Sequence, residues 1–142
     1  MNPEPGQTSG NGNPAILFLF ILVIMFFSFV YLLTKVLFAL NVKLLVLRVG
    51  MALALLHLVI SFLYQRSAFA KYKKTLAERY KEDFGFVDWQ YIDSITSFMS
   101  IHVNKQFFNV NTYMMFLTAS LFFSLLLVGF FNKKWQVAER EE

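Results

Sequence analysis

The chain has 142 residues, enough for one domain, and it is unusually apolar. Hydrophobic residues supply 57% of the positions, Phe alone supplies 18, and charged residues supply 15%, with a net charge of +4. A soluble domain averages roughly 45–50% apolar and about 25% charged residues. This balance excludes a disordered chain and a nucleic-acid binder with a broad basic face, and the absence of cysteine excludes a disulfide scaffold. We therefore expect an all-α integral membrane protein.

A polar tail at residues 1–14 precedes the first predicted membrane span. Residues 15–34 carry no charged side chain, and at about 1.5 Å per residue such a helix reaches roughly 30 Å, the thickness of a hydrocarbon core. Pro14 stands directly before this run, where an α-helix tolerates proline. The tail contains neither Lys nor Arg, so it lacks the basic region of a signal peptide. We expect a retained first span that runs to about residue 39.

The second predicted span covers residues 44–65, directly after a turn at residues 41–43. It contains two basic residues, Arg48 near its start and His57 past its middle. Because the turn is short, the first two spans should form an antiparallel transmembrane hairpin over residues 15–65.

Residues 66–111 are too polar to cross a membrane and are predicted to form a basic amphipathic helical connector. Residues 66–83 hold six bases against three acids and repeat apolar side chains at helical spacing; this helix either stands alone or continues the second span. The sequence Phe84-Gly85-Phe86 should end it, and Asp88 is a good N-cap for a second helix. The apolar stripe of that second helix is wide enough for an interfacial position; it consists of Ile92, Ile95, Phe98, Met99, Ile101 and Val103.

A third span is predicted at residues 112–131, and a charged tail at residues 132–142 follows it. Three spans place the N-terminal tail and the connector on the same side of the membrane. Basic residues number seven on that side and six on the other, so the positive-inside rule gives no decision. The dense basic cluster at residues 66–81 favours the cytoplasmic or matrix side for the connector.

Small and polar side chains mark one face of the second span and part of the third. On the second span they recur at spacings of four, three and four, which puts them on one helix face. Small residues four apart let two helices approach closely, and the third span carries such a pair of serines. The predicted helix-packing faces consist of Gly50, Ala54, His57, Ser61, Ser120 and Ser124.

His57 is the residue most open to a chemical interpretation, because an ionisable residue inside a span is a functional hypothesis by default. We favour a hydrogen-bonding role at a helix contact. The alternatives are proton or quinone chemistry and axial ligation of a haem shared with another subunit. The second histidine, His102, belongs to the connector, and no carboxylate lies in any predicted span. We therefore expect no catalytic residue, no bound cofactor and no metal site in this chain.

Basic residues beside the spans are predicted to contact phospholipid headgroups or a partner subunit. A Lys or Arg near the end of a span extends its charged group toward the headgroups, and anionic lipids attract it. The residues assigned to this role are Arg48, Arg66, Lys71, Lys73 and Lys74.

The sequence favours a non-catalytic accessory subunit of a larger membrane complex. Phe-rich spans with few small-residue faces make a poor self-contained core, since lipid provides little hydrophobic drive between helices. The composition resembles that of accessory subunits of respiratory-type complexes, which implies the mitochondrial inner membrane or the bacterial cytoplasmic membrane. The expected partners are other integral membrane subunits and phospholipids, and no nucleic acid. Two alternatives stay open: a small channel or transporter component, and a membrane anchor of an electron-transfer enzyme that uses His57.

Overall fold

The computed structural model describes residues 13–98 and 100–141, with side chains described through Phe131. Over these residues the chain is helical and has no strand. Three helices are long and apolar enough to cross a membrane: α1 (Ala15–Ala39), α2 (Leu44–Phe84) and the Val110–Phe131 part of α5 (Val110–Glu141). The predicted all-α class with three candidate spans is confirmed, and the arrangement is compatible with a multi-pass membrane protein.

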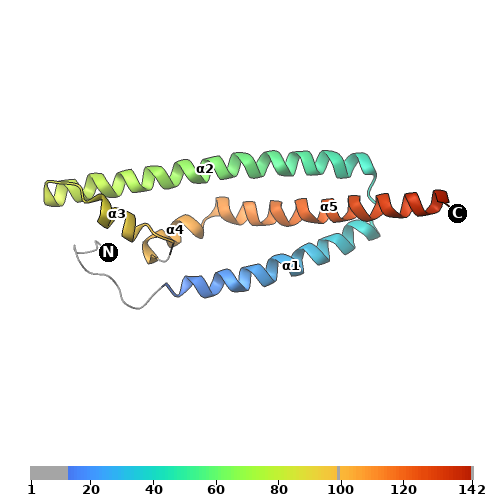
Figure 1. The fold of residues 1–142 in the computed structure, drawn as a ribbon, viewed down its shortest axis with the longest axis horizontal. Helices are drawn as coiled ribbons and strands as arrows, with labels where there is room; N and C mark the ends of the chain where they lie inside the picture. The colour runs from blue at the N-terminus through green and yellow to red at the C-terminus, as the bar shows by residue number, and fades with distance from the viewer. Residues whose placement is uncertain (1–12, 99, 142) are drawn as a thin grey trace.

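The three long helices lie side by side with α5 in the middle (Figure 1). α1 and α2 are joined by a short turn and run in opposite directions, yet each packs mainly on α5 and only weakly on the other. The two helices of the predicted hairpin are therefore held together through the third helix. α1 begins, and α2 ends, on the side of the molecule where α3 and α4 lie (Figure 1).

A proline and two asparagines determine where α1 begins and ends. Pro14 precedes the helix as predicted, and the Asn13 side-chain oxygen accepts a hydrogen bond from the backbone N–H of Ala15 at 3.0 Å. After α1, Asn41 adopts a left-handed backbone with φ 46°, a conformation that Asn tolerates better than most residues. This residue reverses the chain within the short turn that leads into α2.

α2 is one continuous helix of 41 residues. At a rise of about 1.5 Å per residue it is about 60 Å long, roughly twice the thickness of a hydrocarbon core. Of the two possibilities left by the sequence, the helix over residues 66–83 therefore continues the second span. The helix ends at Gly85, whose φ is 79° and whose N–H donates to the Lys81 carbonyl at 2.8 Å. This left-handed cap confirms the predicted stop.

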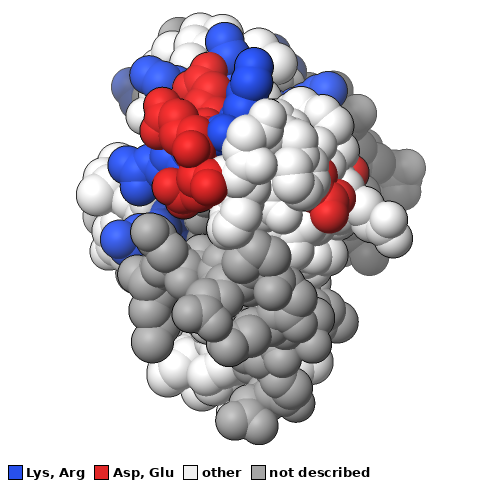
Figure 2. All heavy atoms as spheres, turned by 90° about the vertical axis from the view of Figure 1, so that its left-hand side faces the viewer, with Lys and Arg blue, Asp and Glu red and all other residues white. Residues whose placement is uncertain are grey.

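The chain then folds back along α2 through three short helices: α3 (Trp89–Ile95), the 3₁₀-helix η1 (Ile101–Val103) and α4 (Asn104–Phe107). We call residues 66–109, the second half of α2 together with this return segment, the head. Figure 2 views the head from its end and shows a group of acidic side chains with Lys and Arg around it, over the end of α2. The head thus carries charges of both signs, unlike the apolar spans.

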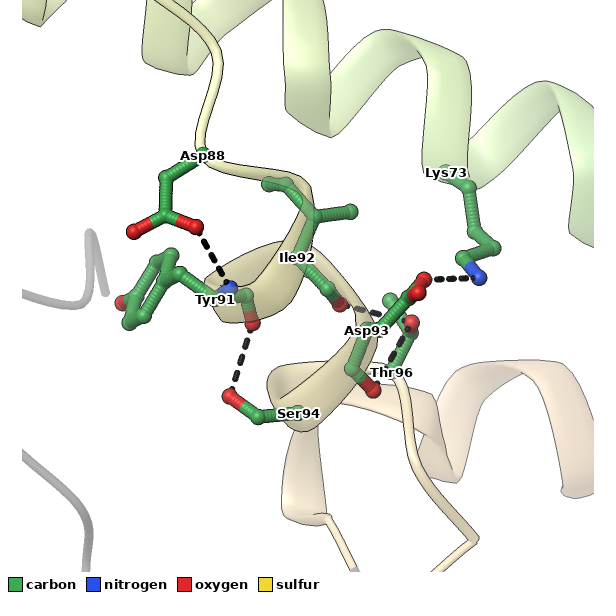
Figure 3. A network of polar contacts seen from close by, with 7 residues as sticks. All are labelled: Lys73, Asp88, Tyr91, Ile92, Asp93, Ser94 and Thr96. Atoms are coloured by element: carbon green, nitrogen blue, oxygen red, sulfur yellow. Dashed lines mark hydrogen bonds and ion pairs between the residues drawn. The ribbon is translucent and has the colours of Figure 1, made fainter.

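Asp88 caps α3 as predicted, because its carboxylate accepts a hydrogen bond from the Tyr91 N–H at 3.0 Å (Figure 3). α3 is shorter than its apolar stripe suggested. It ends at Thr96, whose hydroxyl donates to the Ile92 carbonyl at 2.7 Å, and Met99 lies outside the described residues. Ile92 and Val103, from the two ends of that stripe, are buried. The return segment therefore has an apolar contact within the head.

The left-handed cap of α2 gives a first test. Gly85→Ala should destabilise the head by about 1–2 kcal/mol, because an L side chain is strained at this φ, although a Cβ there would meet no other atom within 4 Å. Thermal unfolding followed by circular dichroism in detergent measures the loss. Gly85→Asn is the matched control and should lose less, since Asn adopts this conformation more readily. Equal losses in the two variants would show that backbone strain is not the cause.

Candidate functional site

The contact between α2 and α5 contains a small apolar core. Leu47, Leu125 and Val128 are buried together, and partly buried Leu37, Val42 and Met51 pack around them. A Cβ on Gly50 would lie 3.1 Å from Cδ1 of Leu125, which is a tight contact. Glycine at this position therefore permits the approach of the two helices.

The other predicted packing residues of α2 lie on the same helix face. Ala54 and Ser61 are each 5% exposed, and the Ser61 carbonyl accepts a hydrogen bond from Asn111 of α5. His57 is half-buried, and its Nε2 lies 3.2 Å from the Ser61 hydroxyl. The structure thus places this face, at least at Gly50 and Ser61, against α5.

The two serines of α5 lie at its contact with α1. Ser120 and Ser124 are both fully buried. The Ser124 hydroxyl lies 2.7 Å from the Ser120 carbonyl of its own helix and 3.1 Å from the Val30 carbonyl of α1. Ser124 can therefore link two helices through a backbone carbonyl, a contact that the sequence does not specify. Beside it, the ring of Phe26 makes edge-to-face contacts with two aromatic rings of α5 at 5.8 Å.

Amide side chains join the helices at the boundary between the spans and the head. Asn111 donates to the Ser61 carbonyl at 3.1 Å and to the Gln65 side-chain oxygen at 3.0 Å. Gln65 in turn donates to the Gln106 carbonyl at 2.6 Å. Asn109 and Thr112 exchange backbone-to-side-chain hydrogen bonds and so cap the start of α5. These groups satisfy backbone atoms where α4 gives way to α5.

A second amide contact fastens the start of α1 to the head. The side chains of Asn13 and Asn104 exchange two hydrogen bonds, at 2.7 and 3.1 Å, and Asn13 also donates to the Ser100 carbonyl at 3.1 Å. The sequence pattern assigns no role to either asparagine. The one available signal was the concentration of asparagines at the ends of the predicted spans.

His57 has one nitrogen in the Ser61 contact and one without a contact. Its Nδ1 is buried and has no hydrogen-bond partner among the described residues. In the same part of the chain, no group of three or more His, Asp or Glu side chains lies close enough to hold a metal ion. Among the described residues, His57 therefore has one hydrogen-bond contact, which is with Ser61 of its own helix.

The basic residues assigned to headgroups or partners fall into two groups. Lys73 pairs with Asp93 of α3 (Figure 3), and Lys74 lies 3.8 Å from Glu78 on the next turn of α2. Arg48, Arg66 and Lys71 are exposed and take part in no ion pair within the described residues. Of the five residues assigned from the sequence, these three remain available for an external anion.

Tyr72 links α2 to the return segment of the head. Its hydroxyl donates to the His102 carbonyl at 3.0 Å, and burial raises the pKa of Tyr72 above its ordinary value of 10.0. The phenol therefore keeps the proton that makes this hydrogen bond. Together with the Lys73–Asp93 ion pair, this bond holds the return segment against α2.

Comparison with protein-family models, curated proteins and solved structures finds no match to this chain.

The Gly50 contact gives a second test. Gly50→Leu should weaken the packing of α2 on α5 by about 1–3 kcal/mol, because the added side chain must displace buried Leu125. Unfolding in mixed micelles with increasing denaturing detergent measures the change. Gly129→Leu on α5 is the matched control, since a Cβ there meets no atom within 4 Å. If Gly129→Leu costs as much as Gly50→Leu, the close approach at Gly50 is not limiting.

A third test concerns the amide contacts. Asn111→Leu keeps the approximate size of the side chain and removes its bonds to Ser61 and Gln65, so the same assay should show a loss of roughly 1 kcal/mol. Ser28→Ala is the control, because within the described residues the Ser28 hydroxyl donates to the Ile24 carbonyl of its own helix and makes no bond to another helix. A loss no larger than that of Ser28→Ala would mean that the amide bonds do not hold α2 and α5 together.

Proposed function

We propose that this protein is a non-catalytic structural subunit of a larger membrane assembly. The observation that carries the proposal is how little of the apolar surface the chain buries by itself. In the most apolar part of each candidate span, 6% of the residues of α1, 17% of α2 and 22% of α5 are buried. The side chains that stay exposed along the three spans must be covered by lipid or by other helices.

The exposed apolar surface contains many Phe side chains, and this composition favours contact with protein partners over part of that surface. Phe18, Phe20 and Phe27 of α1 are each more than 60% exposed, and aromatic side chains contribute large contact areas where helices pack. Because lipid tails are as apolar as these side chains, close packing and hydrogen bonds must provide the affinity between subunits. Other integral membrane subunits are the partners that fit such a surface.

The head gives the subunit a second place of contact. If the apolar half of α2 crosses the bilayer, Arg66 and Lys71 lie within about 10 Å of its end, at the depth of the headgroups. Each can contribute about 1 kcal/mol beside an anionic leaflet. We propose that these two residues, with Arg48 at the opposite end of the span, bind phospholipids, and that the return segment lies close to the interface.

In this proposal His57 serves the helix contact and has no redox or proton-transfer role. Its support is the bond to Ser61 and the absence of carboxylates from the apolar runs of the sequence. We propose that the larger assembly is an energy-transducing complex of the respiratory type, in a mitochondrial inner membrane or a bacterial cytoplasmic membrane.

Removal of the chain from the cells that make it should lower the amount of one large membrane complex before it changes the rate of the complex that remains. Native gel electrophoresis with quantitative mass spectrometry measures abundance, and turnover per assembled complex measures rate. Gly50→Leu should reduce assembly, whereas His57→Ala should be mild. The proposal fails if the purified protein alone carries ions or substrate across liposomes. It also fails if His57→Ala abolishes turnover in a complex that is fully assembled.

A further inference from the structure

The head contains a cavity of about 420 Å³ between the end of α2 and the return segment. This volume lies within the range of about 300–1,000 Å³ that is usual for small-molecule sites. One wall comes from α2 and another from α3 and η1, and Lys105 of α4 also lines the cavity. None of the roles described above uses this space.

Aromatic and apolar side chains make up much of the lining of the cavity. Tyr80 contacts the ring of Phe84 at 4.7 Å and that of Tyr91 at 5.4 Å, so rings from α2 and α3 form one continuous aromatic surface. Ile92, which is 1% exposed, and half-buried Leu76 also line the cavity. A surface of this kind attracts a cation whose outer atoms are methyl groups, through ring electrostatics and apolar contact together.

Charges of both signs line the cavity. Arg79 and Lys105 contribute positive charge, and Asp83, one helical turn after Arg79, contributes negative charge. All three are exposed, and within the described residues none of them is in an ion pair. A guanidinium and an ammonium suit a phosphate, which Arg can bind through two parallel hydrogen bonds. Asp83 opposes a simple anion but favours a ligand that also carries a positive charge.

We propose that this cavity binds a zwitterion that joins a quaternary ammonium to a phosphate, that is, a phosphocholine group. The trimethylammonium lies against the tyrosine rings and near Asp83, and the phosphate meets Arg79 and Lys105. The proposal stands apart from the structural role proposed above, since it concerns the head and not the packing of the spans. The group can belong to a free molecule or to the headgroup of a lipid.

The experiment uses the full chain purified in a maltoside detergent, which contains neither choline nor phosphate. Isothermal titration calorimetry compares phosphocholine with choline, inorganic phosphate and adenosine monophosphate. Phosphocholine should bind most tightly, and Arg79→Gln and Asp83→Asn should each weaken it by about tenfold, as expected for loss of a charged contact. Lys81→Gln and Glu82→Gln are the matched controls, because these exposed side chains on the same helix do not line the cavity.

A second arm distinguishes the two sources of the group. The protein is equilibrated with equal amounts of phosphatidylcholine and phosphatidylglycerol, washed in maltoside, and its retained lipids are counted by mass spectrometry. Selective retention of phosphatidylcholine that is lost in Arg79→Gln supports the site and assigns it to a lipid; binding of free phosphocholine alone assigns it to a soluble ligand. Equal or tighter binding of phosphate or adenosine monophosphate overturns the proposal. So does a lack of binding in both arms, or an equal effect of the control substitutions.

Discussion

The position of α5 between α1 and α2 is the constraint on which the rest of the structure depends. The first two helices enter the fold through a short turn, yet most of their lateral contacts are made with α5. On one side α5 presents Leu125 to Gly50, and on the other it presents Ser124 to the Val30 carbonyl. A helix with small or well-fitting side chains on two different faces can pack against two neighbours at once. The cost is that neither neighbour is covered on its outer side.

The contacts among the three long helices differ between the two ends of the helices. At the end near the turn between α1 and α2 they are apolar, with Leu47, Leu125 and Val128 buried together. At the head they are amide hydrogen bonds, among them those of Asn111 with Ser61 and of Asn13 with Asn104. At a membrane boundary water can form hydrogen bonds with an amide side chain in the unfolded state, so an amide costs little free energy there. The hydrogen bonds of an amide are also directional. Apolar packing sets the spacing of the helices, and the amides set their register.

The local features of the fold could be predicted because each depends on a few neighbouring residues. The length of an uncharged run defined the spans, Gly85 ended α2 through its own backbone freedom, and Asp88 capped α3 through one hydrogen bond. The position of α5 between α1 and α2 could not be predicted, because it depends on which of several apolar helix faces pack against one another. The apolar stripe also suggests a longer α3 than the structure has. Within that stripe the Thr96 hydroxyl donates to the Ile92 carbonyl where the helix ends. The cavity of the head joins residues far apart in sequence, and no local spacing marks it. The assignment of Gly50, Ala54, His57, Ser61, Ser120 and Ser124 to assembly with partners stays a prediction.

The unbroken length of α2 makes the chain a lever arm. A rod of about 60 Å that tilts by about 10° moves its far end by roughly 10 Å. The Lys73–Asp93 ion pair and the Tyr72–His102 hydrogen bond hold the return segment against the second half of α2, so the return segment moves with the helix. A small reorientation of the apolar half of α2 would thereby be converted into a large displacement of the head. Mechanical coupling of this kind requires no hinge, only a helix that does not stop at the membrane surface.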